Sequence, residues 1–546
     1  MVGFLPILGM AGAESSHHES ARNSDDEAGK VGAQVSAIRA HQEFLADDLM
    51  RGRDTGSPEH EIAARYVASY FQALGLEPAG DEGTFLQAVP LLQYQVDTDS
   101  LHMSAKGPSG ELEFKWKEDF LMGGDAVREE TSITAPVVFV GHGIVAPDLD
   151  HDDYEGVDVE NKIVLMIGGA PASLPHNQRA YYSSGSNKIQ EAVDRGAVGV
   201  ISFRNSERAQ KYPWERVTRN SGRPGMTWLN ASGEASDYWP EIEGSAFLRQ
   251  ETVERMLEGS GHTLQELLEA EATHSLESFE LPIEVSLSQT TTHERISSSN
   301  VAAILRGSDP QLQDEYVLYT AHSDHVGVGA EVDGDDIYNG AYDNALGVSI
   351  LMEAARIFAT AKARPARSIL FLTVTAEEKG LLGSKYFARF PTVPIDSIVA
   401  NINLDMPLLL YPLADVIAFG AEHSSLEAPV SHAAQVVGFE LTEDPMPEEV
   451  LFIRSDQYSF VREGIPSIFF VSGMQSSDPE IEGGAVMQEF LTQHYHAPSD
   501  ELSLPVDWDS AKRFTDANYL IGLEVANTPE RPTWNEGDFF GERFKR

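Results

Sequence analysis

Short, uninterrupted apolar runs recur through the second half of the chain, each about as long as a buried strand. They occupy residues 316–320, 368–374, 398–404 and 467–471. Strands that are apolar on both faces are typical of parallel sheets covered by helices. Residues 347–358 and 381–390 have the composition of such covering helices. The pattern predicts an α/β fold with a mixed, mostly parallel central sheet flanked by helices.

The N-terminal part of the chain has a different pattern of apolar residues, which predicts helices first and strands after them. Apolar residues recur at helical spacing over residues 57–75, where Ser57 suits the N-cap, Pro58 the first helical position and Gly75 the residue after the end. A second helix is predicted at residues 38–50, and strands are predicted at 85–90 and 94–103. These elements are expected to join the central sheet.

The pattern of apolar and polar residues changes near Ala135, where a predicted buried strand is followed by a glycine-rich turn. Further strands at residues 162–166 and 196–201, with a helix at 188–195 between them, indicate a compact β-rich module without a cluster of His or acidic residues suited to chemistry. The predicted organisation is a signal-like segment and tether at 1–34, the first part of one domain at 35–131, an inserted domain at 132–290, the rest of the first domain at 291–530, and a tail at 531–546.

Composition narrows the classes of function. A length of 546 residues requires two or more domains, and 42% hydrophobic content supports packed cores. The formal charge of −47 makes nucleic acid an improbable partner. The chain has no cysteine, so His and carboxylate are the strong metal ligands left to it.

No apolar stretch is long enough to span a bilayer. The first residues are apolar and end in Ala11-Gly12-Ala13, which resembles the end of a secretory signal peptide, although the basic start is missing and the apolar part is short. We therefore expect a secreted or periplasmic protein, and a truncated signal peptide would explain the missing basic start.

Acidic and imidazole side chains follow the apolar runs or lie in glycine-rich turns. They are His322, Asp343, Glu377, Glu378, Asp405 and His496. Loops at the carboxyl edge of a sheet commonly present ligands. Two imidazoles and three carboxylates, with one carboxylate left over, meet the needs of two zinc ions and a general base.

Each motif is modest by itself. Asp324 lies close enough in sequence to orient a metal-bound His322, although an H-x-D pair on a surface is common. The Asp343-Asn344 turn could place a carboxylate between two ions, although such pairs usually mark plain turns.

The adjacent Glu377 and Glu378 would repel each other at a strand end unless positive charge lay nearby. The repulsion would be relieved if one glutamate bound a metal ion and the other accepted a proton from water. The alternative interpretation is that both simply belong to the acidic first turn of a helix. Asp405 ends an apolar run and needs a partner. His494 competes with His496 as a ligand.

Taken together and in this order, the motifs resemble the two-zinc aminopeptidases of metallopeptidase family twenty-eight, which also includes glutamate carboxypeptidase and the transferrin receptor. The matching segments are A-H-S-D-H-V-G, N-G-A-Y-D-N-A-L-G-V, T-A-E-E-K-G-L-L-G-S, N-L-D-M and Y-H-A-P-S-D. Residues 135–202 resemble a protease-associated domain. The resemblance implies a zinc exopeptidase fold and two zinc ions per chain.

The resemblance also implies roles for the candidate residues. His322 and Asp405 would hold one zinc, Glu378 and His496 the other, and Asp343 would bridge them. Glu377 would be the general base, and Asp324 would orient His322.

The implied activity is removal of N-terminal residues from peptides with a free amino terminus. A carboxypeptidase or dipeptidase of the same family, a single-zinc glutaminyl cyclase and a catalytically inactive receptor-like binding protein are the alternatives. The last of these predicts eroded ligands, and none is eroded in this sequence.

Overall fold

A computed structural model describes residues 32–219 and 221–545 of the chain. The signal-like segment and most of the predicted tether, together with Ala11 to Ala13, lie outside the described residues. Among the residues described, no helix is both long and apolar enough to cross a membrane.

A mixed sheet forms the centre of the larger region. Its strands lie in the order β11 (Gly225–Trp228), β2 (Leu86–Val96), β13 (Phe279–Leu305), β17 (Ser368–Val374), β14 (Tyr316–His322), β18 (Ile398–Asn403), β21 (Ser467–Ser472), β19 (Asp415–Phe419) and β20 (Glu440–Thr442). The strands β17, β14, β18 and β21 run parallel to one another. All four strands predicted from apolar runs are confirmed, and so is the α/β class.

Helices cover both faces of this sheet, as the side chains of β14 show. Val317 and Tyr319 point into the core on one face, whereas Tyr316 and Leu318 point into the core on the other. The first face is covered by α2 (Val35–Leu45), α3 (Pro58–Ala73), α10 (Leu346–Thr360), α12 (Glu427–Val437) and α15 (Trp508–Asn527). The second face is covered by α11 (Leu382–Arg389) and α13 (Gln457–Val461). Two-sided burial explains why these strands are apolar without interruption.

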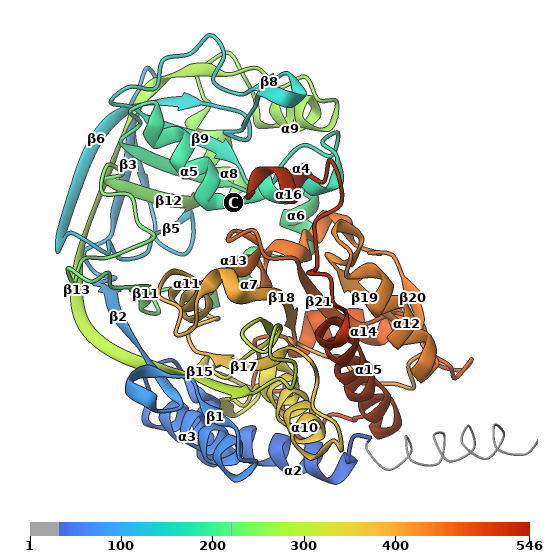
Figure 1. Ribbon diagram of the computed structural model, residues 1–546. Coiled ribbons are helices and arrows are strands. Elements are labelled where there is room, and N and C mark those ends of the chain that lie inside the picture. The colour runs from blue at the N-terminus through green and yellow to red at the C-terminus, as the bar shows by residue number, and fades with distance from the viewer. Residues whose placement is uncertain (1–31, 220, 546) are drawn as a thin grey trace, which may run out of the picture.

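A second sheet forms the smaller region, which lies above the first in Figure 1. Its strands lie in the order β4 (Gly110–Phe114), β3 (His102–Gly107), β13, β6 (Glu130–Phe139), β9 (Ile163–Ile167), β10 (Gly199–Phe203), β12 (Gly244–Leu248) and β5 (Phe120–Leu121). Helices α8 (Gln250–Met256) and α9 (Leu264–Ala272) pack on one face, and α5 (Gly185–Asp194) packs on the other.

The long strand β13 belongs to both sheets and runs along one side of the molecule in Figure 1. Residues 279–290 pair with β6 (with a bulge between Leu281 and Glu284), and residues 291–301 pair with β2. The predicted boundary between residues 290 and 291 falls at this change of partner. The structure places β3, β4 and β5 in the second sheet as well, although they precede the predicted boundary at 132. The reason is that β3 and β4 form a hairpin that pairs with β13.

The N-terminal elements agree with the sequence in part. Helix α3 begins after Ser57, whose hydroxyl accepts a hydrogen bond from the backbone N–H of His60 at 3.1 Å, so the predicted cap is confirmed. Helix α2 ends at Leu45, earlier than predicted, and a 3₁₀ segment, Asp48–Arg53, follows. The limits of the two strands predicted at 85–90 and 94–103 are wrong. A single strand, β2, covers residues 86–96, because it pairs with β13 without a break, and the next strand, β3, begins only at His102.

The end of the chain contacts the smaller region. Helix α16 (Phe539–Arg543), drawn in red in Figure 1, packs beside α4 (His176–Ser183). Phe540 lies in an apolar cluster that contains Tyr181 of the smaller region and Phe452 and Phe469 of the larger one. The described part of the segment predicted as a tail, residues 531–545, therefore helps to join the two regions.

The remaining strands and α-helices are short: β1 (Glu77–Pro78), β7 (Val145–Ala146), β8 (His151–Asp152), α6 (Ser206–Lys211), α7 (Trp214–Arg219), β15 (Gly327–Val332), β16 (Asp335–Tyr338) and α14 (Gly483–Glu489).

Candidate metal centre

Three parallel strands end at the same edge of the central sheet, and candidate ligands follow their ends. β14 ends at His322, β17 ends just before Glu377 and Glu378, and β18 ends just before Asp405. Because the carboxyl ends of neighbouring parallel strands meet at one edge, these side chains are brought together from distant parts of the sequence.

Two further candidates come from turns that face this edge. Asp343 lies in a single π-helical turn, Ala341–Ala345, which leads into α10. The carboxylate of Asp500 fixes this turn by accepting hydrogen bonds from the backbone N–H groups of Tyr342 at 2.9 Å and Asp343 at 3.0 Å. His496 lies just beyond the turn Phe490–His494 and has a positive φ of 54°, a conformation unusual for a residue with a side chain.

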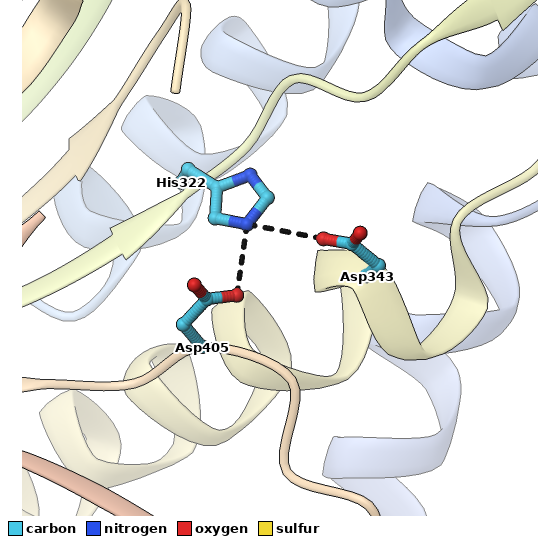
Figure 2. A group of neighbouring side chains, drawn as sticks. All are labelled: His322, Asp343 and Asp405. Carbon is cyan, nitrogen blue, oxygen red and sulfur yellow. Dashed lines mark hydrogen bonds and ion pairs between the residues drawn. The ribbon is translucent and has the colours of Figure 1, made fainter. Parts of the chain in front are cut away.

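The first group of side chains, named here the first cation site, consists of His322, Asp343 and Asp405. Nε2 of His322 lies 3.2 Å from Asp343 Oδ1 and 2.9 Å from Asp405 Oδ1. Figure 2 draws these two contacts as dashed lines. All three side chains are buried, and their ligand atoms lie close enough to one another to hold a single cation. The hydroxyl of Ser455 donates a hydrogen bond to Asp405 Oδ2 at 2.7 Å, which leaves Oδ1 facing the imidazole.

The second group, named the second cation site, consists of Asp343, Glu378 and His496. Nε2 of His496 lies 3.2 Å from Asp343 Oδ2 and 3.0 Å from Glu378 Oε2. Asp343 therefore contributes one oxygen to each group, which is the arrangement of a bridging carboxylate. His325 also reaches this group, and its ligand atom forms a compact set with Asp343 and Glu378 that could hold a cation.

Asp343 and Glu378 favour their charged forms despite their burial. Burial would raise the pKa of Asp343, but the neighbouring His325, His322 and His496 hold it at about 2. Burial would also raise the pKa of Glu378, yet His496 and His325 hold it well below its usual range. Such a convergence of opposite charges is the environment in which buried carboxylates stay ionised and can bind metal.

Asp324 supports the site differently from the expectation. The sequence predicts that its carboxylate orients His322, but Oδ1 lies 4.0 Å from His322 Nδ1. The backbone oxygen of Asp324 lies nearer, at 3.1 Å from Nδ1, and accepts its proton when Nε2 serves as the ligand. The carboxylate instead accepts from the backbone N–H of Glu377 at 3.1 Å and from the hydroxyl of Thr55 at 2.9 Å. Asp324 thus ties the loop that carries His322 to the loop that carries Glu377.

Glu377 stands apart from the ligands. The groups able to hold a cation among the residues described do not include it. Burial raises the pKa of Glu377 well above its usual range, and the negative charges of Asp405 and Glu378 add to this rise against the opposing effect of His322. A carboxylate with a raised pKa beside the ligands is suited to accept and return a proton.

Sequence reasoning missed two residues of the site. His325 is fully buried beside Glu378, and its place in the H-S-D-H motif was the available signal. Arg53 is also buried, and it donates hydrogen bonds to the backbone oxygens of Leu45, Ser323, Asn339 and Gly340. It thereby fixes the loops that precede Asp324 and Asp343, although a lone arginine far away in the sequence gives no signal of such a role.

An apolar pocket of about 170 Å³ is lined in part by Met406 and Tyr495. These residues are the sequence neighbours of the ligands Asp405 and His496, so the pocket lies beside the metal centre. Its lining includes Leu408, Phe469, Met487 and Leu491, together with Lys211, Tyr212 and Arg216 of the smaller region. The pocket thus draws on both regions of the molecule. Leu408 follows Asp405 closely in the sequence, and Met487 lies in α14 (Gly483–Glu489).

Comparisons with known proteins bear on this site. Residues 300–521 match the model described as Peptidase family M28. The chain is 36% identical over 111 residues to a probable zinc metalloprotease of Pyrenophora teres f. teres, covering 20% of this chain and 23% of that protein. It is 29% identical over 212 residues to the aminopeptidase YwaD of Bacillus subtilis, covering 37% of this chain and 41% of that protein. The matched stretches therefore span less than half of these relatives.

The whole fold has a counterpart among solved structures. The aminopeptidase from Aneurinibacillus sp. strain AM-1 superposes with a TM-score of 0.53 at 19% identity, covering 91% of this chain and 95% of that one. At this identity the likeness concerns the fold alone, and it extends over both regions of the molecule.

Proposed function

Because residues 300–521 form a peptidase family M28 domain, we propose that the chain is a zinc-dependent aminopeptidase. It removes N-terminal residues from peptides, with two zinc ions bound at the first and second cation sites and with Glu377 as the general base. Relatives described as zinc metalloprotease and aminopeptidase support the same class of activity.

The observation that carries the proposal is the position of Asp343 between two imidazoles. Its Oδ1 lies 3.2 Å from His322 Nε2 and its Oδ2 lies 3.2 Å from His496 Nε2. Asp405 completes the first site and Glu378 completes the second. A shared carboxylate with one further imidazole and one further carboxylate on each side is a donor set that suits a pair of zinc ions.

The chemistry of the donors fits zinc on two further counts. Nδ1 of His322 faces the carbonyl oxygen of Asp324 at 3.1 Å, so Nδ1 can keep its proton when Nε2 acts as the ligand. Nδ1 and Nε2 of His325 and Oε1 of Glu378 are buried without a hydrogen bond of ordinary geometry to any residue that the structure describes. Such unsatisfied groups are expected where a cation belongs.

Bound zinc would acidify a water molecule and polarise the carbonyl of the scissile peptide bond. Glu377 accepts the proton of the attacking water, since it is held beside the ligands without belonging to them, and then passes the proton to the amine that leaves. Asp324 keeps Glu377 in place through the backbone hydrogen bond of 3.1 Å. The pocket beside Met406 and Tyr495 lies where the side chain of the N-terminal residue would bind.

The test combines metal analysis with a substrate panel. Aminoacyl amides, free peptides and N-acetylated peptides are incubated with the full chain, with and without a chelator. We expect about two zinc ions per chain, cleavage of substrates with a free amino terminus, and loss of this activity on chelation that added zinc restores. Cleavage of the acetylated peptides would overturn the exopeptidase assignment, and a chain that is active without metal would overturn the zinc assignment.

A further inference from the structure

A short helix of the smaller region, α7, reaches the apolar pocket beside the metal centre. Trp214 anchors this helix to its own region: the indole N–H donates to the backbone oxygen of Lys117 at 2.7 Å, and the ring stacks on that of Phe247 with the centroids 5.8 Å apart. In the same helix, Arg216 extends to the larger region, where Nη2 donates to the backbone oxygen of Leu491 at 2.7 Å. The side chain of Arg216 is therefore fixed at both ends, by its helix and by the carbonyl it binds.

The carbonyl that receives Arg216 belongs to a segment that leads into the second cation site. Leu491 lies in the turn Phe490–His494, which ends just before the ligand His496. Leu491 and Arg216 both line the apolar pocket, and so does Tyr495, the neighbour of that ligand. Arg216 thus forms part of the wall of the cavity in which, under the proposed function, the side chain of the N-terminal residue binds.

The charges that line this pocket do not cancel. Among the described residues of its lining, Glu449 is the single carboxylate, whereas Lys211, Arg216 and Arg454 are cations. Glu449 is already engaged by other cations, because it contacts Lys211 and its Oε2 lies 3.3 Å from Arg454 Nη1 and 3.6 Å from Arg208 Nη2. The lining therefore carries an excess of positive charge on otherwise apolar walls.

Arg216 holds the part of this charge that Glu449 does not offset. Its guanidinium binds the carbonyl of Leu491, and the centroid of the Tyr212 ring lies 5.9 Å from its central carbon. Neither contact supplies a full negative charge, and no carboxylate in the described part of the chain forms an ion pair with Arg216. Arg216 is also half-buried, so water screens its charge less than at an open surface.

We propose that Arg216 is a specificity-determining residue: its fixed positive charge makes the pocket favour uncharged apolar N-terminal side chains and disfavour those of lysine and arginine. The inference rests on the proposed function, which puts the N-terminal side chain of the substrate in this pocket. An apolar side chain gains free energy when its surface leaves water for apolar walls. A cationic side chain of the same length loses its hydration there and meets a like charge, which is selection by repulsion.

The experiment compares the amides of lysine and norleucine, whose side chains share the same unbranched carbon chain and differ by the terminal ammonium. The ratio of their kcat/KM values is measured for the full-length wild type and for Arg216→Met, Arg216→Lys and Arg219→Met. Arg219→Met is the matched control, because Arg219 ends the same helix and is exposed. Arg216→Lys keeps the charge and changes its shape. Calorimetry with free lysine and free norleucine gives the corresponding ratio of dissociation constants without catalysis.

In the wild type we expect kcat/KM for the lysine amide to be lower than for the norleucine amide by roughly 10-fold. Arg216→Met should raise the lysine-to-norleucine ratio by roughly 5-fold, because the other cations of the lining remain. Arg216→Lys and Arg219→Met should keep the ratio of the wild type. The ratio is the readout because a loosened pocket alters both rates, whereas a lost repulsion favours lysine alone.

Three results would overturn the inference. A wild type that cleaves the lysine amide as well as the norleucine amide, or better, would mean that the pocket does not reject a cation. A ratio unchanged in Arg216→Met would mean that the rejection has another source. An equal rise in Arg216→Met and Arg216→Lys would make the shape of the guanidinium, and not its charge, the cause. A wild type that cleaved neither amide would instead refute the proposed function, while the calorimetric ratio would still test the charge.

Discussion

Two buried side chains of the smaller region and two buried ligands of the metal centre have pKa values that shift in opposite senses, the first pair toward the neutral form and the second toward the charged form. In the smaller region Lys188 is fully buried and donates hydrogen bonds to the backbone oxygens of Ile167 and Gly169, and burial lowers its pKa to about 7. Burial likewise lowers the pKa of His142 to about 3. At the metal centre of the larger region, Asp343 and Glu378 are equally enclosed, yet both pKa values move toward the charged form.

The difference teaches that burial alone does not mark a functional site. A lone buried group is driven toward its neutral form, because a low dielectric disfavours charge. A cluster of opposite charges reverses that tendency and keeps each member ionised. The convergence of imidazoles and carboxylates, and not their depth, therefore separates the metal centre from the buried histidine and lysine of the smaller region.

The largest effect is expected from removing the shared carboxylate. Asp343→Asn takes one ligand from each cation site, so both ions should be lost together and activity should fall by more than the ~10⁴-fold that loss of a general base can cost. Zinc analysis and initial rates measure the result. The matched control is Asp153→Asn, which changes a half-buried acid of the smaller region that accepts from the backbone N–H groups of His142 and Ile144. Loss of only one ion from Asp343→Asn would contradict a bridging role.

A smaller loss is expected from Glu377, which lies beside the ligands without joining them. Glu377→Gln should keep both zinc ions and lower kcat by about 10²- to 10⁴-fold, because the amide cannot accept the proton of water. Steady-state rates and zinc content are measured on the same sample. Near-normal turnover would refute the role of general base, and loss of zinc would place Glu377 among the ligands.

The smaller region offers a test on stability through Lys188. Its pKa is about 7 in the folded chain against the ordinary 10.5, so between these values the unfolded chain holds a proton that the folded chain does not. Stability should therefore rise with pH across this window. Lys188→Met removes this dependence, so the stability of the wild type relative to this variant should rise by an amount on the order of 4 kcal/mol across the window.

Urea unfolding of both proteins at a series of pH values between 6 and 10 measures this difference. The control is Lys162→Met, because Lys162 in the same region contacts Glu280 at 2.7 Å and its side chain reaches solvent. If the stabilities of wild type and Lys188→Met ran parallel with pH, the buried ammonium would not be the source of the effect.

The smallest effect is expected where the two regions meet through ion pairs. Lys211 of the smaller region contacts the buried Glu449 of the larger one, which also accepts from the hydroxyl of Tyr212 at 3.0 Å and lies 3.3 Å from Arg454. Because Lys211 is 31% exposed and Glu449 keeps other partners, Lys211→Met should cost about 1 kcal/mol or less.

The matched variant is Lys385→Met, which removes a second ion pair between the regions, to Asp237. Both are compared with the wild type by urea unfolding. A loss of ~3 kcal/mol or more from either would show that the contact behaves as a fully buried pair.

Much of the fold and of the site could be predicted, because the apolar runs and the residues after them lie together in the sequence. The strand that ends at Val374 and the acids that follow it needed no knowledge of distant contacts. The limits of β2 and β3, in contrast, could not be predicted without knowledge of distant contacts, since both are decided by pairing with β13. The atom of Asp324 that faces His322 could not be predicted either, because a carbonyl and a carboxylate of one residue are separated only by the local course of the backbone.

The unbroken course of β13 through both sheets has a consequence for dissecting this protein. A fragment that begins at residue 291 would keep the half of β13 that pairs with β2 and lose the half that pairs with β3 and β6. A fragment that keeps the whole of Phe279–Leu305 without the smaller region would carry a ribbon of unpaired amides into solvent, a surface prone to join other chains. Because β13 is shared by both sheets, we expect the two regions to fold well only when they are expressed together.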